Sequence, residues 1–194
     1  PYLSALLNGD PLEPFICETE HENLWVLPSS PEASDLRVVR DLEAADADEL
    51  RQRMRDAAEP FDYVILDCPP SLAGSPTLAL ELSDGLIVPV QCEYYALEGV
   101  SKLDASIRLV QRYLNPSLEI EGVLLTLYDE RLQLCRRVAE EARRYFGDKV
   151  YETIIRRNIS IAEAPGFGKP VILYDPGSKG TDNYSSLASE ICAA

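Results

Sequence analysis

Residues 61–71, FDYVILDCPPS, constrain the fold of this chain more than any other stretch. An unbroken run of four apolar residues, 63–66, ends at Asp67. Such a run is typical of a strand that is buried on both faces, at the centre of a parallel sheet. Pro69 and Pro70 follow, and because proline restricts both its own backbone and that of the preceding residue, they predict a stiff, extended turn. The sequence therefore predicts a strand over 61–67 with a carboxylate at its C-terminal end.

Asp67 is the first candidate functional residue. Ligands of open α/β sheets bind beyond the C-terminal ends of the strands. A rigidly held carboxylate at this edge can hold a hydrated Mg²⁺. The alternative is an aspartate that only caps a turn or a helix. This stretch alone leaves both interpretations open.

The rest of the chain alternates expected strands with expected helices, at the spacing of βαβ crossovers. We therefore predict an α/β fold, with a doubly wound, mostly parallel sheet and helices on both faces, in a single domain over residues 1–194. The expected strands are 24–27, 61–67, 85–90, 120–127 and 149–155, with a short extended stretch at 171–174. The expected helices are 2–7, 46–58, 98–113, 132–146 and 182–191, and 72–82 is expected to form a loop and a helix.

Composition excludes several classes of function. No apolar run approaches the length that crosses a bilayer, and no signal peptide opens the chain. The five cysteines are scattered without a CxxC pair, which suits reduced cytosolic thiols better than disulfides or zinc. A single histidine, His21, argues against a histidine-based centre. The chain starts at Pro1 without a methionine, so we expect preceding residues to be missing.

The charge of the chain is strongly acidic overall but locally basic. The net charge is −15, whereas residues 131–157 alone carry +4. A basic patch on an acidic body can bind the phosphate backbone of nucleic acid. The alternative is a salt-bridged helix, because Arg136 and Glu140, Arg137 and Glu141, and Glu140 and Arg144 are all spaced i, i+4.

Four segments, in this order, resemble the ParA/Soj family of chromosome- and plasmid-partitioning ATPases, which is related to MinD. The resemblance runs from about Leu24 to the end of the chain. The segments are FDYVILDCPPSL (61–72), PVQCEYYALEG (89–99), GVLLTLYDER (122–131) and NISIAEAPGFGKPVILYDPGSKG (158–180). The resemblance implies a deviant-Walker P-loop ATPase that uses ATP and Mg²⁺. It also implies a homodimer in the ATP form, non-specific DNA binding, hydrolysis stimulated by a ParB-type partner, no membrane partner, and a cytoplasmic, nucleoid-associated location.

The resemblance assigns nucleotide-related roles to four residues. Asp67 falls on the catalytic Walker-B aspartate, which acts through Mg²⁺ and its bound water. Asp129, Arg156 and Asn158 fall near positions that lie beside the adenine in relatives.

Two arginines are implied to contact DNA. Arg131 falls on a position that relatives use for DNA contact, and its alternative role is a helix-start arginine paired with Glu130 or Asp129. Ser160 stands where relatives often carry a second DNA-contacting arginine. Arg157, together with Arg156, is close enough in sequence to compensate.

The chain departs from the family at its phosphate loop. The family's GGxGKT segment would precede Pro1, and this sequence contains no G-x-x-x-x-G-K-[ST]. Its glycine-rich stretch 166–169 is followed by Pro170, so we interpret it as a structural loop. We expect the N-terminal βαβ part of the fold to be missing, and we expect this chain alone neither to bind ATP tightly nor to hydrolyse it.

Three alternatives compete with a fragment of a partitioning ATPase. One is a relative without a P-loop, a binding or regulatory module that docks on ParA or ParB. A MinD-like membrane-cycling ATPase needs a basic amphipathic C-terminal helix, whereas this chain ends LASEICAA. An iron–sulfur carrier of the same superfamily needs paired cysteines, and none are paired in the sequence.

Overall fold

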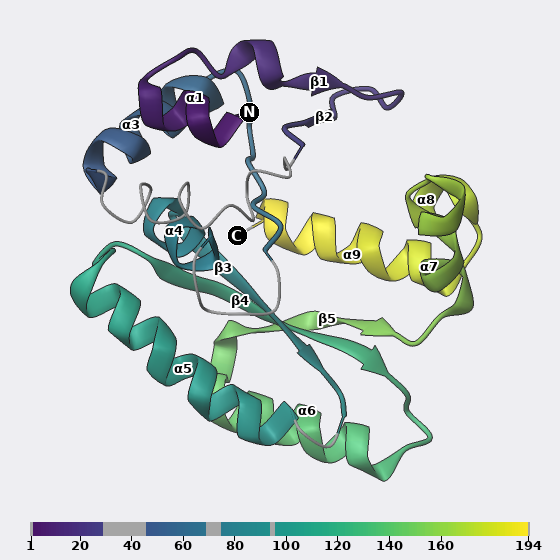
Figure 1. The fold of residues 1–194 in the computed structure, drawn as a ribbon. Coiled ribbons are helices and arrows are strands. Elements are labelled where there is room, and N and C mark those ends of the chain that lie inside the picture. The colour runs from purple at the N-terminus through teal and green to yellow at the C-terminus, as the bar shows by residue number, and fades with distance from the viewer. Residues whose placement is uncertain (1, 29–45, 69–74, 94–95, 194) are drawn as a thin grey trace. The chain divides into compact units, whose positions relative to one another are not determined.

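The chain folds into two compact units, which are described separately. The computed structural model describes residues 2–28, 46–68, 75–93 and 96–193 (Figure 1). The first unit comprises Pro1–Asp84 and Leu109–Leu118, and the second comprises Gly85–Arg108 and Glu119–Ala194. The expectation of a single domain over 1–194 stays a prediction.

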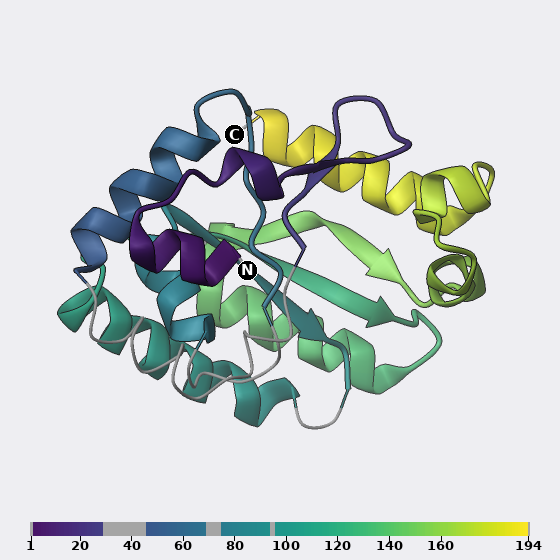
Figure 2. The same ribbon diagram turned by 45° about the horizontal axis from the view of Figure 1, so that its top comes forward.

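The second unit is built on a parallel three-stranded sheet. Its strands are β3 (Gly85–Gln91), β4 (Glu119–Tyr128) and β5 (Val150–Arg156), in the order β3-β4-β5. Helix α6 (Gln133–Phe146) packs on one face and α9 (Lys179–Ala193) on the other (Figures 1 and 2). The prediction of an α/β fold with a parallel sheet covered on both faces is confirmed.

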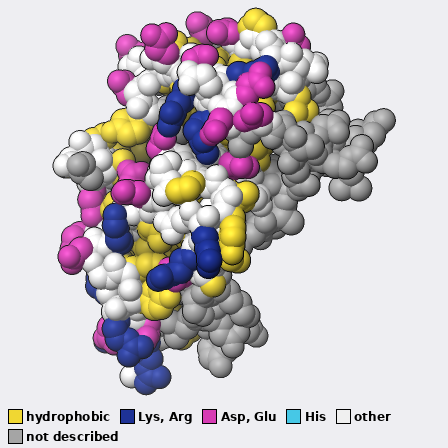
Figure 3. Space-filling view, turned by 90° about the vertical axis from the view of Figure 1, so that its left-hand side faces the viewer, with side chains coloured by type: hydrophobic (Ala, Val, Ile, Leu, Met, Phe, Trp, Pro, Cys, Tyr) yellow, Lys and Arg dark blue, Asp and Glu magenta, His cyan; other side chains and the backbone are white. Residues whose placement is uncertain are grey.

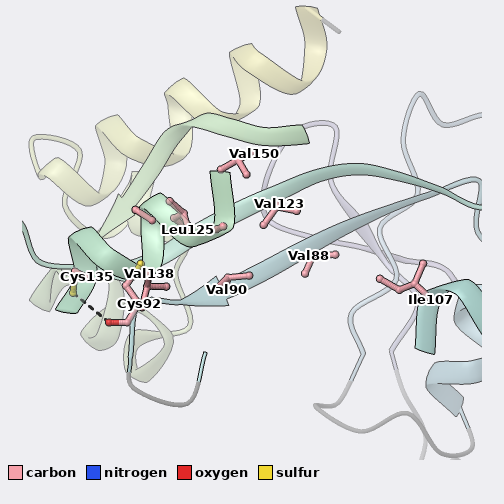
Figure 4. Packing of buried hydrophobic residues seen from close by; sticks show 11 residues of the cluster. Val88, Val90, Cys92, Ile107, Val123, Leu125, Cys135, Val138 and Val150 are labelled. Atoms are coloured by element: carbon pink, nitrogen blue, oxygen red, sulfur yellow. Dashed lines mark hydrogen bonds between the residues drawn. The ribbon is translucent and has the colours of Figure 1, made fainter. Parts of the chain in front are cut away.

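Strand β4 is buried on both faces, as its apolar sequence predicts. Val123 and Leu125 point to the α6 side, where they pack against Val138 and Cys135 (Figure 4). Leu124 points to the opposite side and packs in a cluster with Leu187 of α9. This alternation is the two-residue period of a strand, and it explains why the sequence of β4 is apolar at every position in its middle.

Polar side chains of α9 cover the outer edge of β5. The Glu190 carboxylate accepts hydrogen bonds from the backbone N–H groups of Glu152 (2.7 Å) and Thr153 (3.0 Å). The Asn183 side chain accepts a third from the backbone of Arg156, at 3.1 Å. The helix therefore satisfies donors that an edge strand would otherwise expose.

The buried cysteines of the second unit belong to its core. Cys92 and Cys135 are free thiols, and the Cys135 Sγ lies 3.2 Å from the carbonyl oxygen of Cys92 (Figure 4). Burial raises the pKa of the Cys92 thiol to about 11. The Cys92 thiol is therefore neutral at physiological pH, and both buried side chains pack as small apolar groups.

Two neighbouring helices on one side of the sheet are linked by a polar contact. Helix α5 (Ala96–Tyr113) begins in the second unit and ends in the first. Its Asp104 accepts a hydrogen bond from the Tyr145 hydroxyl of α6 at 2.9 Å and an ion pair from Arg108 at 2.7 Å. Ile107 of α5 is buried in the same core as β4.

The segment between β5 and α9 is helical rather than extended. It contains α7 (Ile159–Glu163), the 3₁₀ turn η4 (Ala164–Phe167) and α8 (Val171–Tyr174), and another 3₁₀ turn, η3 (Gly147–Lys149), precedes β5. The prediction of an extended stretch at 171–174 is wrong. The Pro170 carbonyl oxygen accepts hydrogen bonds from the backbone N–H groups of Leu173 (3.0 Å) and Tyr174 (2.9 Å). The apolar run is too short for its periodicity to distinguish a strand from a helix.

The first unit packs short helices around a small core. Its elements are α1 (Tyr2–Asn8), the 3₁₀ turn η1 (Glu13–Phe15), β1 (Cys17–Glu18), β2 (Trp25–Val26), α3 (Ala47–Ala58) and α4 (Ser75–Leu82). Leu6, Leu12 and Leu50 are buried together. Asp46 caps α3 by accepting the N–H of Asp48 at 3.0 Å, as its position before the helix predicts.

The apolar run at 61–67 does not form the expected buried strand. It pairs with no strand in the described part of the chain, and Ile65 is 89% exposed. A strand needs hydrogen bonds to a neighbouring strand. An apolar run predicts that a strand can form, but it does not provide that neighbour. The described sheet β3-β4-β5 provides none for this run. The stiff turn expected at Pro69 and Pro70 lies outside the described residues.

Candidate functional site

Charged residues follow the C-terminal ends of all three parallel strands. Glu93 follows β3, Asp129 follows β4, and Arg157 follows β5. The Arg157 backbone N–H donates to the Tyr128 carbonyl at 3.0 Å, and its guanidinium lies 3.1 Å from the Glu93 carboxylate. These residues lie together at the edge where open α/β sheets bind ligands. Glu93 was not predicted from the sequence. The signal that could have found it is its position just after the expected strand 85–90.

Asp129 and Arg131 form a tight ion pair. Asp129 Oδ1 accepts the Arg131 Nε–H at 2.9 Å, and Oδ2 accepts Nη2–H at 2.7 Å. Oδ1 also accepts the Arg131 backbone N–H at 3.0 Å. These side-chain and backbone hydrogen bonds lower the pKa of the Asp129 carboxyl to about 2. The alternative considered for Arg131, a pairing with Asp129, is therefore present.

The pair leaves the outer side of Arg131 open. The Asp129 side chain is only 14% exposed, whereas that of Arg131 is 85% exposed. Nε and Nη2 face the carboxylate, so the second amino group, Nη1, has no partner within the described ranges. A guanidinium held in this way can still donate to an anion that approaches from solvent.

The end of β4 carries an unusual backbone conformation. Leu127 has φ 53°, in the left-handed region, and the register with β5 shifts between Leu125 and Tyr128. A leucine in this region costs about 1–2 kcal/mol compared with the right-handed conformation. The irregularity immediately precedes Asp129, so it sets the direction in which the ion pair leaves the sheet.

Arg156 and Asn158, which the resemblance assigns to the adenine, lie at the end of β5. The Arg156 side chain is exposed and makes no ion pair in the part of the chain that the structure describes. The Asn158 Oδ1 caps α7 by accepting the N–H of Ser160 at 2.8 Å. Asn158 therefore has a structural role that is independent of any nucleotide.

Ser160 is tied into the fold. Its hydroxyl donates to the Asp175 carboxylate at 2.6 Å, which links α7 to the loop before α9. Ser160 is therefore a tether between two segments, where the sequence comparison with the family expects an arginine.

The basic helix α6 is not salt-bridged as its spacing predicts. Arg144 pairs with Glu141 at 2.6 Å, a spacing of i, i+3. Arg136 instead donates Nε–H (3.1 Å) and Nη2–H (2.7 Å) to the Glu130 carbonyl oxygen. The three expected i, i+4 pairs are absent from the described contacts, so that prediction is wrong. The turn before α6 brings a backbone carbonyl to Arg136, and side-chain spacing carries no information about such an acceptor.

Basic and acidic side chains are interspersed on the face that Figure 3 shows. Figure 3 shows one face of the molecule, on which basic side chains lie in small groups among acidic ones. Arg137 and Arg143 are exposed, and neither makes an ion pair within the described residues. A ligand with many negative charges would therefore meet separate small groups of cations.

Asp67 belongs to the first unit and is described by itself. It is exposed, in a segment without regular structure. Burial, together with the Asp67 charge, raises the pKa of the neighbouring Cys68 thiol. In the described ranges, no group of three or more His, Cys, Asp or Glu side chains could hold a metal ion. Asp67 can supply one carboxylate to a hydrated Mg²⁺ that phosphates also hold, and its metal role stays a prediction.

None of the helices in the described ranges is both long enough and apolar enough to cross a membrane.

Comparisons with known proteins reveal close relatives. The AAA_31 family model, described as an AAA domain, matches residues 2–120. The chain is 44% identical over 191 residues to the chromosome partitioning protein ParA of Myxococcus xanthus, covering 96% of this chain and 66% of that protein. It is 46% identical over 175 residues to the sporulation initiation inhibitor protein Soj of Bacillus subtilis, covering 90% and 69%. It therefore spans about two thirds of the length of these relatives.

Solved structures share the fold. Cobyrinic acid a,c-diamide synthase from Mycobacterium smegmatis, with bound ADP and magnesium, superimposes with a TM-score of 0.74 at 29% identity, covering 96% of this chain and 69% of that one. The MinD cell division protein of Aquifex aeolicus superimposes with a TM-score of 0.72 at 15% identity, covering 98% and 74%. The second likeness concerns the fold alone.

Proposed function

Because this chain belongs to the ParA/Soj family of partitioning ATPases, we propose that it acts in the segregation of a chromosome or plasmid as a nucleotide-dependent, non-specific DNA-binding protein. The observation that carries the DNA-binding part is the exposed guanidinium of Arg131. It stands at the sheet edge on a carboxylate that fixes it without enclosing it. In a chain of net charge −15, such cations are the surface on which DNA can be bound.

Arg157 is the second proposed contact with DNA. It pairs with Glu93 at 3.1 Å, and both side chains are more than half exposed, at 59% and 54%. An exposed pair of this kind is weak, so a phosphate can replace the carboxylate at little cost. Arg157 is therefore available to DNA even though it is paired in this structure.

The proposed nucleotide is ATP with Mg²⁺, bound by the complete protein. When bound, Mg²⁺ would neutralise part of the negative charge of the phosphates. Asp67 would hold the ion through water. Arg156, which is exposed and unpaired in the described part of the chain, would stack its guanidinium on the adenine, and Asp129 and Asn158 would lie beside it.

Two partners are proposed from the family alone. One is a second copy of the protein, in a homodimer formed with ATP, and the other is a ParB-type protein that stimulates hydrolysis. Two of the relatives named above are a chromosome partitioning protein and a sporulation initiation inhibitor, which supports a cytoplasmic protein that DNA holds on the nucleoid.

A second candidate function concerns the phosphate loop, which these residues do not contain. The sequence given contains no G-x-x-x-x-G-K-[ST], so we expect these residues alone neither to bind ATP tightly nor to hydrolyse it. The alternative is a binding or regulatory module that docks on a ParA- or ParB-type protein. Titration with a fluorescent ATP analogue and Mg²⁺ tests the expectation, and micromolar binding by residues 1–194 would contradict it.

DNA retention by the full-length protein tests the proposed function. We expect duplex DNA of random sequence to be retained at low salt with Mg²⁺ and a non-hydrolysable ATP analogue, and released as salt rises. Retention should be weaker with ADP. A protein that retains no DNA in any nucleotide state would contradict the DNA-binding proposal.

A further inference from the structure

Two arginines are held against the same turn, between β4 and α6. The turn is closed by the Leu132 N–H, which donates to the Asp129 carbonyl at 3.0 Å. Arg131 binds the Asp129 carboxylate through Nε and Nη2. Arg136 binds the Glu130 carbonyl through the same two nitrogens, at 3.1 and 2.7 Å. The acceptors belong to adjacent residues, so both guanidinium groups are held by the same turn.

Each guanidinium uses only part of its donors on the turn. A guanidinium has five N–H donors in a planar fork, and the Nε–Nη2 edge accounts for two of its nitrogens. Nη1 of both arginines has no partner among the described residues, and both residues are exposed. Two exposed guanidinium groups held by one turn therefore keep donors available to solvent.

Arg136 is oriented by a hydrogen bond but has no carboxylate partner among the described residues. Arg131, Arg144 and Arg157 each have a carboxylate partner. Arg136 is held by a neutral carbonyl, so its positive charge is not compensated by an ion pair. The turn therefore carries a fixed cation whose full charge is available to an anion.

We infer that Arg136, held at the same turn as Arg131, is a further contact with the phosphodiester backbone of DNA. A planar guanidinium group fits phosphate oxygens, and two such groups on one turn can bind neighbouring phosphates. Both side chains are exposed and do not enclose a small anion, which favours a polymer that brings many phosphates at once. The inference rests on the proposed DNA binding and adds Arg136, which the sequence indicated only as one cation of the basic segment 131–157 and which the family resemblance did not indicate.

The variant Arg136→Gln tests the site in the full-length protein. The glutamine amide can still donate to the Glu130 carbonyl, so the turn keeps its contact while the charge is lost. We expect DNA affinity to fall about 3- to 10-fold, and the slope of log affinity against log salt to decrease by about 1, as for the loss of one phosphate contact. Arg144→Gln is the matched control on the same helix, with an acid partner, and should leave both quantities unchanged.

A second variant separates geometry from charge. Arg136→Lys keeps the charge, but an ammonium has no separate edges for the carbonyl and the phosphate. We expect it to keep the salt slope and to lose affinity. Wild-type affinity in Arg136→Lys would contradict the two-edged geometry.

The outcomes distinguish the inference from the proposed function. If the wild type retains DNA and Arg136→Gln retains it equally, with an unchanged slope, the inference is wrong and the proposed function stands. If the wild type retains no DNA, the proposed function and the DNA ligand both fail. NMR titration with inorganic phosphate then decides whether the site itself exists: shifts at the Nε resonances of Arg131 and Arg136 would mean a site for free phosphate, and no shifts would mean no site.

Discussion

The side chain of Arg131 lies on the carboxylate of Asp129, with Nε 2.9 Å from Oδ1 and Nη2 2.7 Å from Oδ2. The carboxylate thereby directs a cation outward from the end of a buried parallel strand. This relationship links the sheet, which is strongly specified by the sequence, to the surface that we propose for DNA.

The ion pair predicts an acid-resistant carboxylate. Its pKa is lowered in the folded protein from 3.8 to about 2, so its stabilising effect is present above pH 4 and is lost as pH falls through about 2. We expect an NMR titration of the Asp129 carboxyl carbon to show a midpoint near 2. In Arg131→Gln the midpoint should return toward the ordinary value. A wild-type midpoint near 4 would contradict the ion pair.

Tyr151 and Gly122 predict a steric effect in the sheet. The Tyr151 ring lies over Gly122, so that a Cβ at this position would collide with the ring. We expect Gly122→Ala to lower the free energy of unfolding by about 1–3 kcal/mol, measured by chemical denaturation. Combining it with Tyr151→Leu should recover part of the loss, because the smaller side chain makes room. Strictly additive losses would exclude the contact.

Removal of the Tyr151 hydroxyl should not lower the free energy of unfolding. It is buried and has no hydrogen-bond partner within the described residues. Tyr151→Phe removes an unsatisfied group, so we expect a free energy of unfolding equal to that of the wild type or up to about 1 kcal/mol higher. A clear loss of stability would mean that the hydroxyl has a partner.

At position 127, glycine should give a more stable protein than alanine, the reverse of the usual order in a strand. In an ordinary strand alanine is the more stable residue, but only glycine adopts φ 53° without strain. We expect Leu127→Gly to exceed Leu127→Ala in free energy of unfolding by about 1 kcal/mol. The reverse order would show that the left-handed conformation is not needed at the end of β4.

Much of the fold could be predicted from hydrophobic pattern. The run that became β4 is apolar because both of its faces are covered, whereas β3 buries Val88 and Val90 and leaves Ile87 exposed. The apolar residues of 132–146 follow the period of a helix, which packs into the core. The run 61–67 has the same pattern, yet it is exposed. Strand pairing depends on a second strand that is distant in the sequence, so a local hydrophobic pattern cannot predict it with certainty.

The candidate site could be predicted in part. The family resemblance indicated Asp129, and Arg157 was expected to compensate for Ser160. Both residues follow the C-terminal ends of parallel strands, at the edge where such sheets bind ligands. The contact of Arg136 with the Glu130 carbonyl was out of reach, since a backbone acceptor leaves no trace in the side-chain sequence. The cap that Asn158 supplies to α7 had a signal, an asparagine two residues before a serine, but the helix is too short to show a period.

Substitution of Asp67 should abolish ATP turnover without affecting the stability of the fold. It is exposed and in no regular element, so its removal should leave the free energy of unfolding within about 0.5 kcal/mol of the wild type. In the full-length protein we expect Asp67→Ala to abolish ATP turnover. Asp62→Ala, which removes an exposed carboxylate of the same segment, is the control and should keep turnover. Normal turnover in Asp67→Ala would remove Asp67 from the metal site.

The salt dependence of DNA retention by Arg131→Gln, compared with wild type and Arg144→Gln, tests the DNA-binding surface most directly. The variants remove one charge each, from Arg131, which is proposed to contact phosphate, and from Arg144, which is paired on α6. We predict that Arg131→Gln lowers the log–log salt slope by about 1 and that Arg144→Gln leaves it unchanged. Equal slopes for all three proteins would contradict a DNA-binding role for Arg131.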